Sequence, residues 1–176
     1  MREIPGFHMK TKLLLLSLLA ALLSSSATTW AGLPPGANVL PYEIHNTASG
    51  EQYCQMCQYA DRPATVAAYG KLRDAAFWQD LEKLQALQKS HRSFGFFGQV
   101  LDSTDSAAIQ AEAKKHGITF PLVYAVDPEW EKVYQVGGIS RTVYYSNNFK
   151  IGWSGVGLDD AALAAITGKI KADPQG

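Results

Sequence analysis

From residue 63 the pattern of apolar and polar positions becomes regular. Residues 64–69 are a short, mostly apolar run closed by Gly70, as expected for a strand buried on both faces. Asp74 then stands where a helix N-cap belongs, and the predicted helix runs to about His91. One face of this helix is an apolar stripe at i, i+4 and i+7. The stripe consists of Phe77, Leu81 and Leu84.

Predicted strands and helices follow one another to the end of the chain. Residues 94–101 and 120–126 are two further strand candidates, and between them Asp105 begins a helix that ends before Gly117, a residue suited to a left-handed C-cap. The remaining predicted elements are a short helix introduced by Asp127 and Pro128, a hairpin of residues 142–145 and 150–153, and a last helix from Asp159.

Strands therefore alternate with helices, which favours an α/β fold with helices on both faces of one sheet. The closing hairpin is antiparallel, so the sheet is expected to be mixed. Residues 42–46 are a further short strand candidate ahead of this region. Because neighbouring residues of a strand face opposite sides, Tyr144 and Tyr145 should point to opposite faces, and one of them is expected to be exposed.

The first 31 residues have a different pattern. Lys10 and Lys12 precede an apolar run at 13–23, and small residues follow up to Ala27. This is the layout of a secretory signal peptide, cut after Ala27 or Ala31. The apolar run is shorter than the about 20 residues that span a bilayer. We therefore expect an exported protein, periplasmic or secreted, without a membrane anchor after cleavage.

Charge excludes some partners. Without Arg2, Glu3, Lys10 and Lys12, the 16 basic and 16 acidic residues become 13 and 15, a net charge of −2. This charge gives no electrostatic basis for binding nucleic acid or anionic lipid. We expect another periplasmic protein, a thiol or disulfide partner, instead. Both cysteines would enter an oxidising compartment, where a disulfide is allowed.

Two segments resemble the thioredoxin-like superfamily, specifically its peroxiredoxin and periplasmic thiol-reductase branches. Residues 116–139 read HGITFPLVYAVDPEWEKVYQVGGI and are similar to a peroxiredoxin-type segment with a Phe-Pro-Leu, an Asp and a Tyr-x-Val. Residues 139–155 read ISRTVYYSNNFKIGWSG and are similar to the strand–turn–strand that follows the family's cis-proline. The resemblance implies a three-layer sandwich, a central mixed sheet with helices on both faces.

The N-terminal pattern and the resemblance together predict a division of the chain. Residues 1–31 are the expected signal peptide, 32–62 an N-terminal extension that carries the cysteines, 63–171 the thioredoxin-like domain and 172–176 a tail.

Both parts of the family's usual active site are missing. The first helix after the first core strand begins with residues 71–76, which contain no cysteine, and Ser140 stands in place of the cis-proline. A cis bond without proline costs about 2.5–4 kcal/mol, so a trans bond is expected. The usual dithiol or peroxidatic chemistry is therefore excluded at that place, and no cofactor is expected.

The two cysteines lie before the first core strand, in the segment YCQMCQY. Cys54 and Cys57, with Tyr59, Arg62 and Pro63, resemble a CxxC-x-Y-x-x-R-P pattern of uncharacterised secreted thioredoxin-like proteins. By default the pair would lie at the amino end of the parallel strands. Yet the six residues from Cys57 to Pro63 span up to about 20 Å at roughly 3.3 Å each, so a folded-back segment also reaches the opposite end.

Three chemical interpretations of the pair stay open. A redox-active dithiol would use a low-pKa thiolate and a readily reduced disulfide. A structural disulfide would close too short a loop to add much stability. Two thiolates beside Met56 would suit a soft ion such as Cu(I), whereas a closed zinc site needs four ligands that the sequence does not supply at motif spacing. We expect no metal.

These observations predict an exported protein of thiol–disulfide exchange or redox homeostasis, in which Cys54 attacks and Cys57 resolves. The competing prediction is a redox-inert binding module with a structural Cys54–Cys57 disulfide. In that case the resemblance places Arg73, Ser140 and Arg141 around the vacant cleft, where they would bind a partner or an anion.

Overall fold

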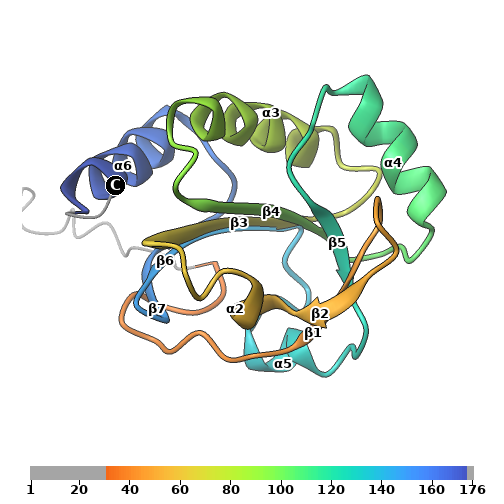
Figure 1. The fold of residues 1–176 in the computed structure, drawn as a ribbon, viewed down its shortest axis with the longest axis horizontal. Helices are drawn as coiled ribbons and strands as arrows, with labels where there is room; N and C mark the ends of the chain where they lie inside the picture. Colours follow the sequence, from red (N-terminus) through yellow and green to blue (C-terminus); the bar gives the residue numbers. More distant parts are fainter. Residues whose placement is uncertain (1–30, 174–176) are drawn as a thin grey trace, which may run out of the picture.

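A computed structural model describes residues 31–173. Within this range seven strands form one mixed sheet in the order β2-β1-β5-β4-β3-β6-β7 (Figure 1). The strands are β1 (Glu43–Asn46), β2 (Gln52–Cys54), β3 (Ala64–Gly70), β4 (Gly95–Val100), β5 (Leu122–Ala125), β6 (Arg141–Asn147) and β7 (Lys150–Gly155). The helices are α2 (Gln55–Gln58), α3 (Ala75–Ser90), α4 (Ser106–Lys115), α5 (Trp130–Val133) and α6 (Asp160–Ala172).

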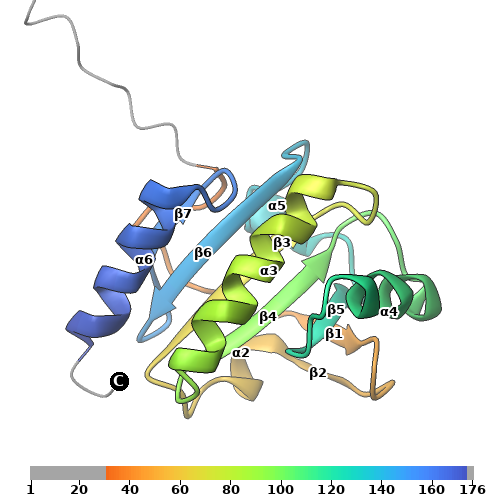
Figure 2. The same cartoon turned by 90° about the horizontal axis from the view of Figure 1, so that it is seen from above.

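Helices cover both faces of this sheet. α3, α4 and α6 lie on one face, and α2 and α5 lie on the other (Figure 1, Figure 2). Each face has its own group of buried apolar side chains. Phe77 of α3 and Ile166 of α6 belong to one group, and Tyr69 of β3 and Phe97 of β4 belong to the group on the α5 face. The predicted α/β sandwich, a central mixed sheet between two helical layers, is confirmed.

The predicted helix starts are confirmed for three long helices. Asp74, Asp105 and Asp159 are the N-caps of α3, α4 and α6, and each carboxylate accepts a hydrogen bond from a first-turn N–H at 2.8–3.0 Å. These bonds satisfy N–H groups that have no partner within the helix. Gly117 follows α4 with φ +64°, the left-handed conformation that the sequence predicts for it.

α5 begins later than the sequence indicates. The sequence predicts Asp127 as the N-cap and Pro128 as the first helical residue, whereas α5 starts at Trp130 and has no side-chain cap. Asp127 Oδ1 instead accepts a hydrogen bond from the N–H of Glu129 at 2.8 Å and closes a turn ahead of the helix. Trp130, the first residue of α5, is buried, and its ring stacks on that of Tyr42 with the centroids 4.9 Å apart.

The hairpin of β6 and β7 is also present, with Asn148 and Phe149 in its turn at φ +48° and +58°. Asn tolerates this left-handed region, whereas Phe is uncommon there. The expectation that Tyr144 or Tyr145 is exposed is wrong. Both are buried, because Tyr144 packs on the α5 face of β6 and Tyr145 packs on the α3 face.

Residues 32–62 belong to the same sheet as residues 63–171. β1 pairs with β5 and β2 pairs with β1, so this segment supplies the outer two strands on one side. Leu33 and Val39 are buried on the α5 face, and the N–H of Leu33 donates to the Tyr144 hydroxyl at 2.8 Å. The cysteine-bearing segment is thereby fixed against the core.

The predicted signal peptide falls on residues 1–31, nearly all of which lie outside the described residues. In residues 31–173, none of the helices has the length and apolar character needed to cross a membrane.

Candidate functional site: the Cys54–Cys57 turn

Cys54 and Cys57 lie at the two ends of one helical turn. Cys54 ends β2 and is the N-cap of α2, and its Sγ accepts a hydrogen bond from the N–H of Cys57 at 3.3 Å. The Cys57 thiol donates to the same sulfur, with the two Sγ atoms 2.7 Å apart. Both cysteines are free thiols in this structure. The sequence spacing alone sets this geometry, because residues three apart in a helix are neighbours.

Tyr59 anchors this turn to the sheet. Its ring stacks on Phe97 with centroids 5.5 Å apart, and its hydroxyl donates to the Phe96 carbonyl at 3.3 Å. Gly95 makes the contact possible, since a Cβ there would lie 2.5 Å from the Tyr59 ring. The N–H of Gln55 adds a hydrogen bond to the Tyr42 carbonyl at 3.0 Å. The tyrosine of the CxxC-x-Y pattern therefore holds the cysteine turn in place.

The default placement of the cysteines at the amino end of the parallel strands is wrong for Cys54. Cys54 pairs with Glu43, and the Glu43 carbonyl accepts a hydrogen bond from Val126, the residue after β5. Cys54 is therefore level with the carboxyl end of β5. The chain then crosses the α5 face and returns to the amino end of β3 at Ala64, as the folded-back alternative requires (Figure 1).

The two sulfur atoms differ in exposure and in their hydrogen bonds. Cys57 is exposed, whereas Cys54 is partly buried. The hydrogen bond from the Cys57 thiol to Cys54 raises the pKa of Cys57, and desolvation adds to this shift. Cys54 accepts two hydrogen bonds and donates neither of them. The pair thus consists of a surface thiol that donates a hydrogen bond and a partly buried sulfur that accepts it.

Cys54→Ala is expected to lower the pKa of Cys57 towards the about 8.5 of an ordinary thiol, because the largest cause of the shift is removed. The pH dependence of alkylation by iodoacetamide, followed at Cys57 by peptide mass spectrometry, measures this change. The midpoint should move to lower pH in the variant. An identical pH profile in both proteins would show that the hydrogen bond to Cys54 does not hold the proton.

The cleft that the resemblance assigns to the family's active site lies elsewhere in the sheet. Residues 71–74 connect the carboxyl end of β3 to α3, and Arg141 begins β6 opposite Gly70. β3 is four strands from β2, which corresponds to roughly 19 Å at about 4.8 Å per strand. Residues 31–173 contain no cis peptide bond, so the bond before Ser140 is trans, as predicted.

The three residues predicted to line that cleft have different neighbours. Ser140 is exposed. Arg73 points to α4, where its guanidinium lies 3.9 Å from Glu112. Arg141 Nε lies 3.0 Å from an oxygen of Asp80, a carboxylate on the buried side of α3. The two guanidinium groups are therefore paired with carboxylates on different helices.

No set of three or more His, Cys, Asp or Glu side chains in residues 31–173 is arranged to hold a metal ion.

No protein-family model and no curated protein matches the chain. Solved structures do match it. A candidate protein disulfide isomerase from Bacteroides thetaiotaomicron superposes with a TM-score of 0.70 at 14% identity, over 84% of this chain and 96% of that one. The thioredoxin domain of a thiol-disulfide oxidoreductase from Bacteroides vulgatus gives 0.65 at 9% identity, over 78% and 99%. The fold is thioredoxin-like. A peroxidoxin from Mycobacterium tuberculosis is also similar, with a TM-score of 0.64 at 14% identity, over 80% and 97%.

Sequence reasoning missed two residues of this thioredoxin-like fold. Asp80 lies on a helix face that the sequence marks only as apolar, and its partner Arg141 is 61 positions away. Gln55 lies between the cysteines, and its side chain is buried although glutamine is usually exposed. The position of Gln55 inside the CxxC segment was the one available indication of a role.

Proposed function

We propose that this thioredoxin-like protein exchanges electrons with disulfides of exported polypeptides through Cys54 and Cys57. The observation that carries the proposal is the pairing of two free thiols 2.7 Å apart, one of them exposed, in a turn fixed against the core. The fold supports it, since the similar solved structures include thiol-disulfide oxidoreductases. The apolar run before Ala27 supports export to the periplasm or beyond the cell.

The proposed reaction has two steps. The Cys54 thiolate attacks one sulfur of the partner's disulfide, a Cys54–partner disulfide forms, and the partner's other sulfur leaves as a thiolate. Cys57 then loses its proton and attacks Cys54 Sγ. This step forms the Cys54–Cys57 disulfide and releases the second partner sulfur. The partner disulfide gains the two electrons that the cysteine pair loses, and a dithiol of the same compartment would reduce the pair again.

The second candidate function is a redox-inert module that binds a partner near Ser140 and Arg141. The exposure of Ser140 and Arg73 at the carboxyl end of β3 favours it. Against it stands the Asp80–Arg141 pair, which neutralises the charge that an anionic partner would recognise.

The reduction potential of the cysteine pair separates the two functions. We expect a value above about −300 mV, in the range of exchange-active pairs such as thioredoxin at about −270 mV. Equilibration with glutathione buffers, followed by thiol trapping and mass spectrometry, gives this value. A disulfide with a reduction potential below about −300 mV behaves as a structural link. Such a value would contradict the proposed function and favour the binding module.

A further inference from the structure

The sheet has two edges, and within residues 31–173 the chain pairs along only one of them. Residues 36–39 run alongside the start of β7, and the N–H of Gly36 donates to the Ile151 carbonyl at 2.7 Å. At the opposite edge β2 is the last strand, and no other strand in the described part of the chain pairs with its outer side. The strand that ends at Cys54 is therefore the open edge of the sheet.

The hydrogen bonds between β1 and β2 decide which backbone groups of β2 point outward. The N–H of Asn46 donates to the Glu51 carbonyl at 2.8 Å, and bonded and non-bonded pairs alternate along antiparallel strands. Tyr53 is therefore bonded to β1, whereas the N–H and C=O groups of Gln52 and Cys54 point to the open edge. The C=O of Cys54 belongs to the first turn of α2, which leaves the N–H of Cys54 and both groups of Gln52 for an incoming chain.

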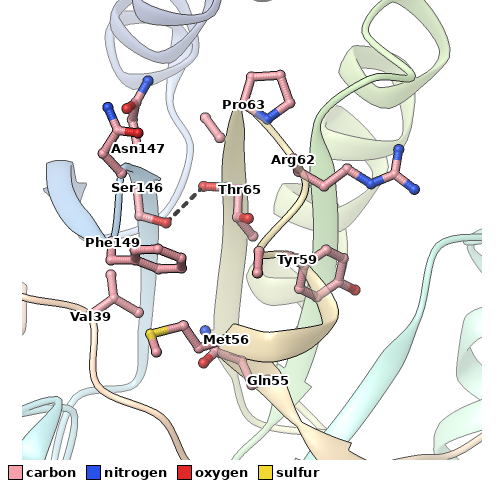
Figure 3. A pocket seen from close by; sticks show the side chains of 13 residues that line it. Val39, Gln55, Met56, Tyr59, Arg62, Pro63, Thr65, Ser146, Asn147 and Phe149 are labelled. Carbon is pink, nitrogen blue, oxygen red and sulfur yellow. Dashed lines mark hydrogen bonds between the residues drawn. The ribbon is translucent and has the colours of Figure 1, made fainter.

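The side of α2 that packs on the protein is not the side that carries the cysteines. Figure 3 shows Met56 and Tyr59 among the side chains around a small pocket between α2 and the turn of β6 and β7. Both side chains pack on the core group of the α5 face. Neither cysteine lines this pocket, and Cys57 is exposed. The cysteine pair is thus directed away from the packed side, towards a partner that approaches from solvent.

An antiparallel strand added to this edge can place a cysteine directly opposite Cys54. The Cα atoms of a bonded antiparallel pair lie about 5.5 Å apart, within the about 4.4–6.8 Å that a disulfide spans. Cys54 has the extended backbone that such pairing requires, with φ −70° and ψ 119°. The Cys54–partner disulfide of the proposed reaction therefore fits between β2 and an added strand.

The side chains of β2 leave its edge open to pairing. β2 has three residues, none of them a Lys or Pro of the kind that commonly protects an edge strand. The side chain of Gln52 donates to Glu43 on β1 at 3.0 Å, on the side away from the open edge. A strand this short offers few hydrogen bonds, so docking is weak until the disulfide forms.

We propose that partner polypeptides dock by adding an antiparallel strand to the β2 edge, with their reacting cysteine opposite Cys54. The partner is an extended segment that is recognised by its backbone and not by particular side chains. The residue two positions after the partner's cysteine then lies opposite Gln52 and exchanges two hydrogen bonds with it. The inference rests on the proposed function for the reacting cysteine, but the added strand is detectable without turnover.

The test uses peptides with one cysteine, activated as a pyridyl disulfide, and one N-methyl group on the backbone. Methylation two residues after the cysteine removes a bond to Gln52 and should slow the reaction with the wild-type protein about five- to tenfold, the effect of one hydrogen bond. Methylation one residue after the cysteine, where the N–H points away from β2, should change the rate less than about twofold. The same holds two residues before the cysteine, where the peptide has passed the end of β2. Absorbance of the released thiopyridone measures each rate.

Two outcomes would overturn the proposal on the unaltered protein. Equal rates for all methylated peptides would show that the backbone of the partner does not pair with β2. A loss of rate on methylation two residues before the cysteine, and not after it, would show a parallel strand and contradict the antiparallel register.

A pair of variants tests the same bond from the side of the protein. Gln52→Pro removes the outward N–H but no bond to β1, and proline is tolerated where the N–H of an edge strand faces solvent. The rate with the unmethylated peptide, divided by the rate with the pyridyl disulfide of mercaptoethanol, should fall about fivefold in this variant. Gln52→Ala keeps the N–H and should keep the ratio. A ratio that falls equally in both variants would assign the effect to the side chain and overturn the proposal.

Hydrogen exchange detects the added strand directly. In the adduct of Cys57→Ser with the unmethylated peptide, the amides of Gln52 and Cys54 should exchange about tenfold more slowly than in the variant alone, whereas Tyr53, already bonded to β1, should not change. Protection of Gln52 and Cys54 that rises with the concentration of the protein alone would assign the edge to a second copy of this chain and overturn the proposal.

The two proposals fail in different ways. Protection of Gln52 and Cys54 in the adduct, without turnover of disulfide substrates by the wild-type protein, would uphold the added strand and contradict the proposed function. Turnover with equal rates for all methylated peptides and no such protection would uphold the function and contradict the added strand.

Discussion

Cys57→Ser is expected to accumulate a covalent disulfide between Cys54 and a partner polypeptide, while turnover of a disulfide substrate falls by more than about 100-fold. The variant keeps the attacking sulfur but removes the thiol that releases the partner. Cys54→Ser should lose turnover to a similar extent without accumulating the adduct. Non-reducing electrophoresis of the two variants after incubation with a disulfide-containing protein, and mass spectrometry of the adduct, measure the difference.

Two properties of the pair act in opposite directions in this experiment. Exposure favours attack by Cys57, whereas the hydrogen bond that raises the pKa of Cys57 keeps that sulfur protonated. We expect protonation to decide, because the thiolate and not the thiol is the nucleophile. Accumulation of the adduct in Cys54→Ser instead would show that exposure decides and that the roles of the two cysteines are reversed. No adduct in either variant would contradict thiol exchange altogether.

Elements formed by local interactions were predictable from the sequence. The three aspartate caps and the apolar face of α3 depend on residues within a few positions of one another, and β3 and β4 were recognisable as apolar runs. The lack of a cysteine in residues 71–76 was equally clear, because it can be read directly from the sequence.

The position of the cysteine turn was not predictable, because it depends on pairing across the sheet. β1 joins β5, some 80 residues later in the chain, and this pairing decides which end of the sheet Cys54 occupies. The same limit applies to burial. Tyr144 and Tyr145 differ in the face that they cover, but only the presence of helices and the N-terminal segment on both sides makes both of them buried.

Arg141→Met is expected to destabilise the fold by about 3 kcal/mol at pH 7, because it leaves the buried Asp80 carboxylate without its cation. Asp80 is 5% exposed, and its other oxygen accepts a hydrogen bond from Leu158 at 2.9 Å. The side chain of Arg141 is 29% exposed, which places the effect at the low end for buried pairs. Urea unfolding of the variant and of the wild-type protein measures the difference.

The pH dependence identifies the cause. Burial raises the pKa of Asp80 above its ordinary value even beside Arg141, and loss of Arg141 should raise this pKa further. A folded-state pKa above the unfolded value means that stability is highest below the unfolded pKa, about 3.9, and falls as pH rises through the folded pKa. The cost of Arg141→Met should therefore be small near pH 4 and grow towards pH 7.

Two further variants separate this structural role from ligand binding. Arg73→Met removes a guanidinium that lies 3.9 Å from Glu112 on a side chain that is 83% exposed, and should cost less than about 0.5 kcal/mol. Asp80→Leu combined with Arg141→Met removes both charges, and should recover part of the stability that Arg141→Met loses. A cost of Arg141→Met that is equal at pH 4 and pH 7, or a double variant less stable than the single one, would show that Arg141 stabilises the fold through packing and not through Asp80. In that case its charge would be available to a partner at the vacant cleft.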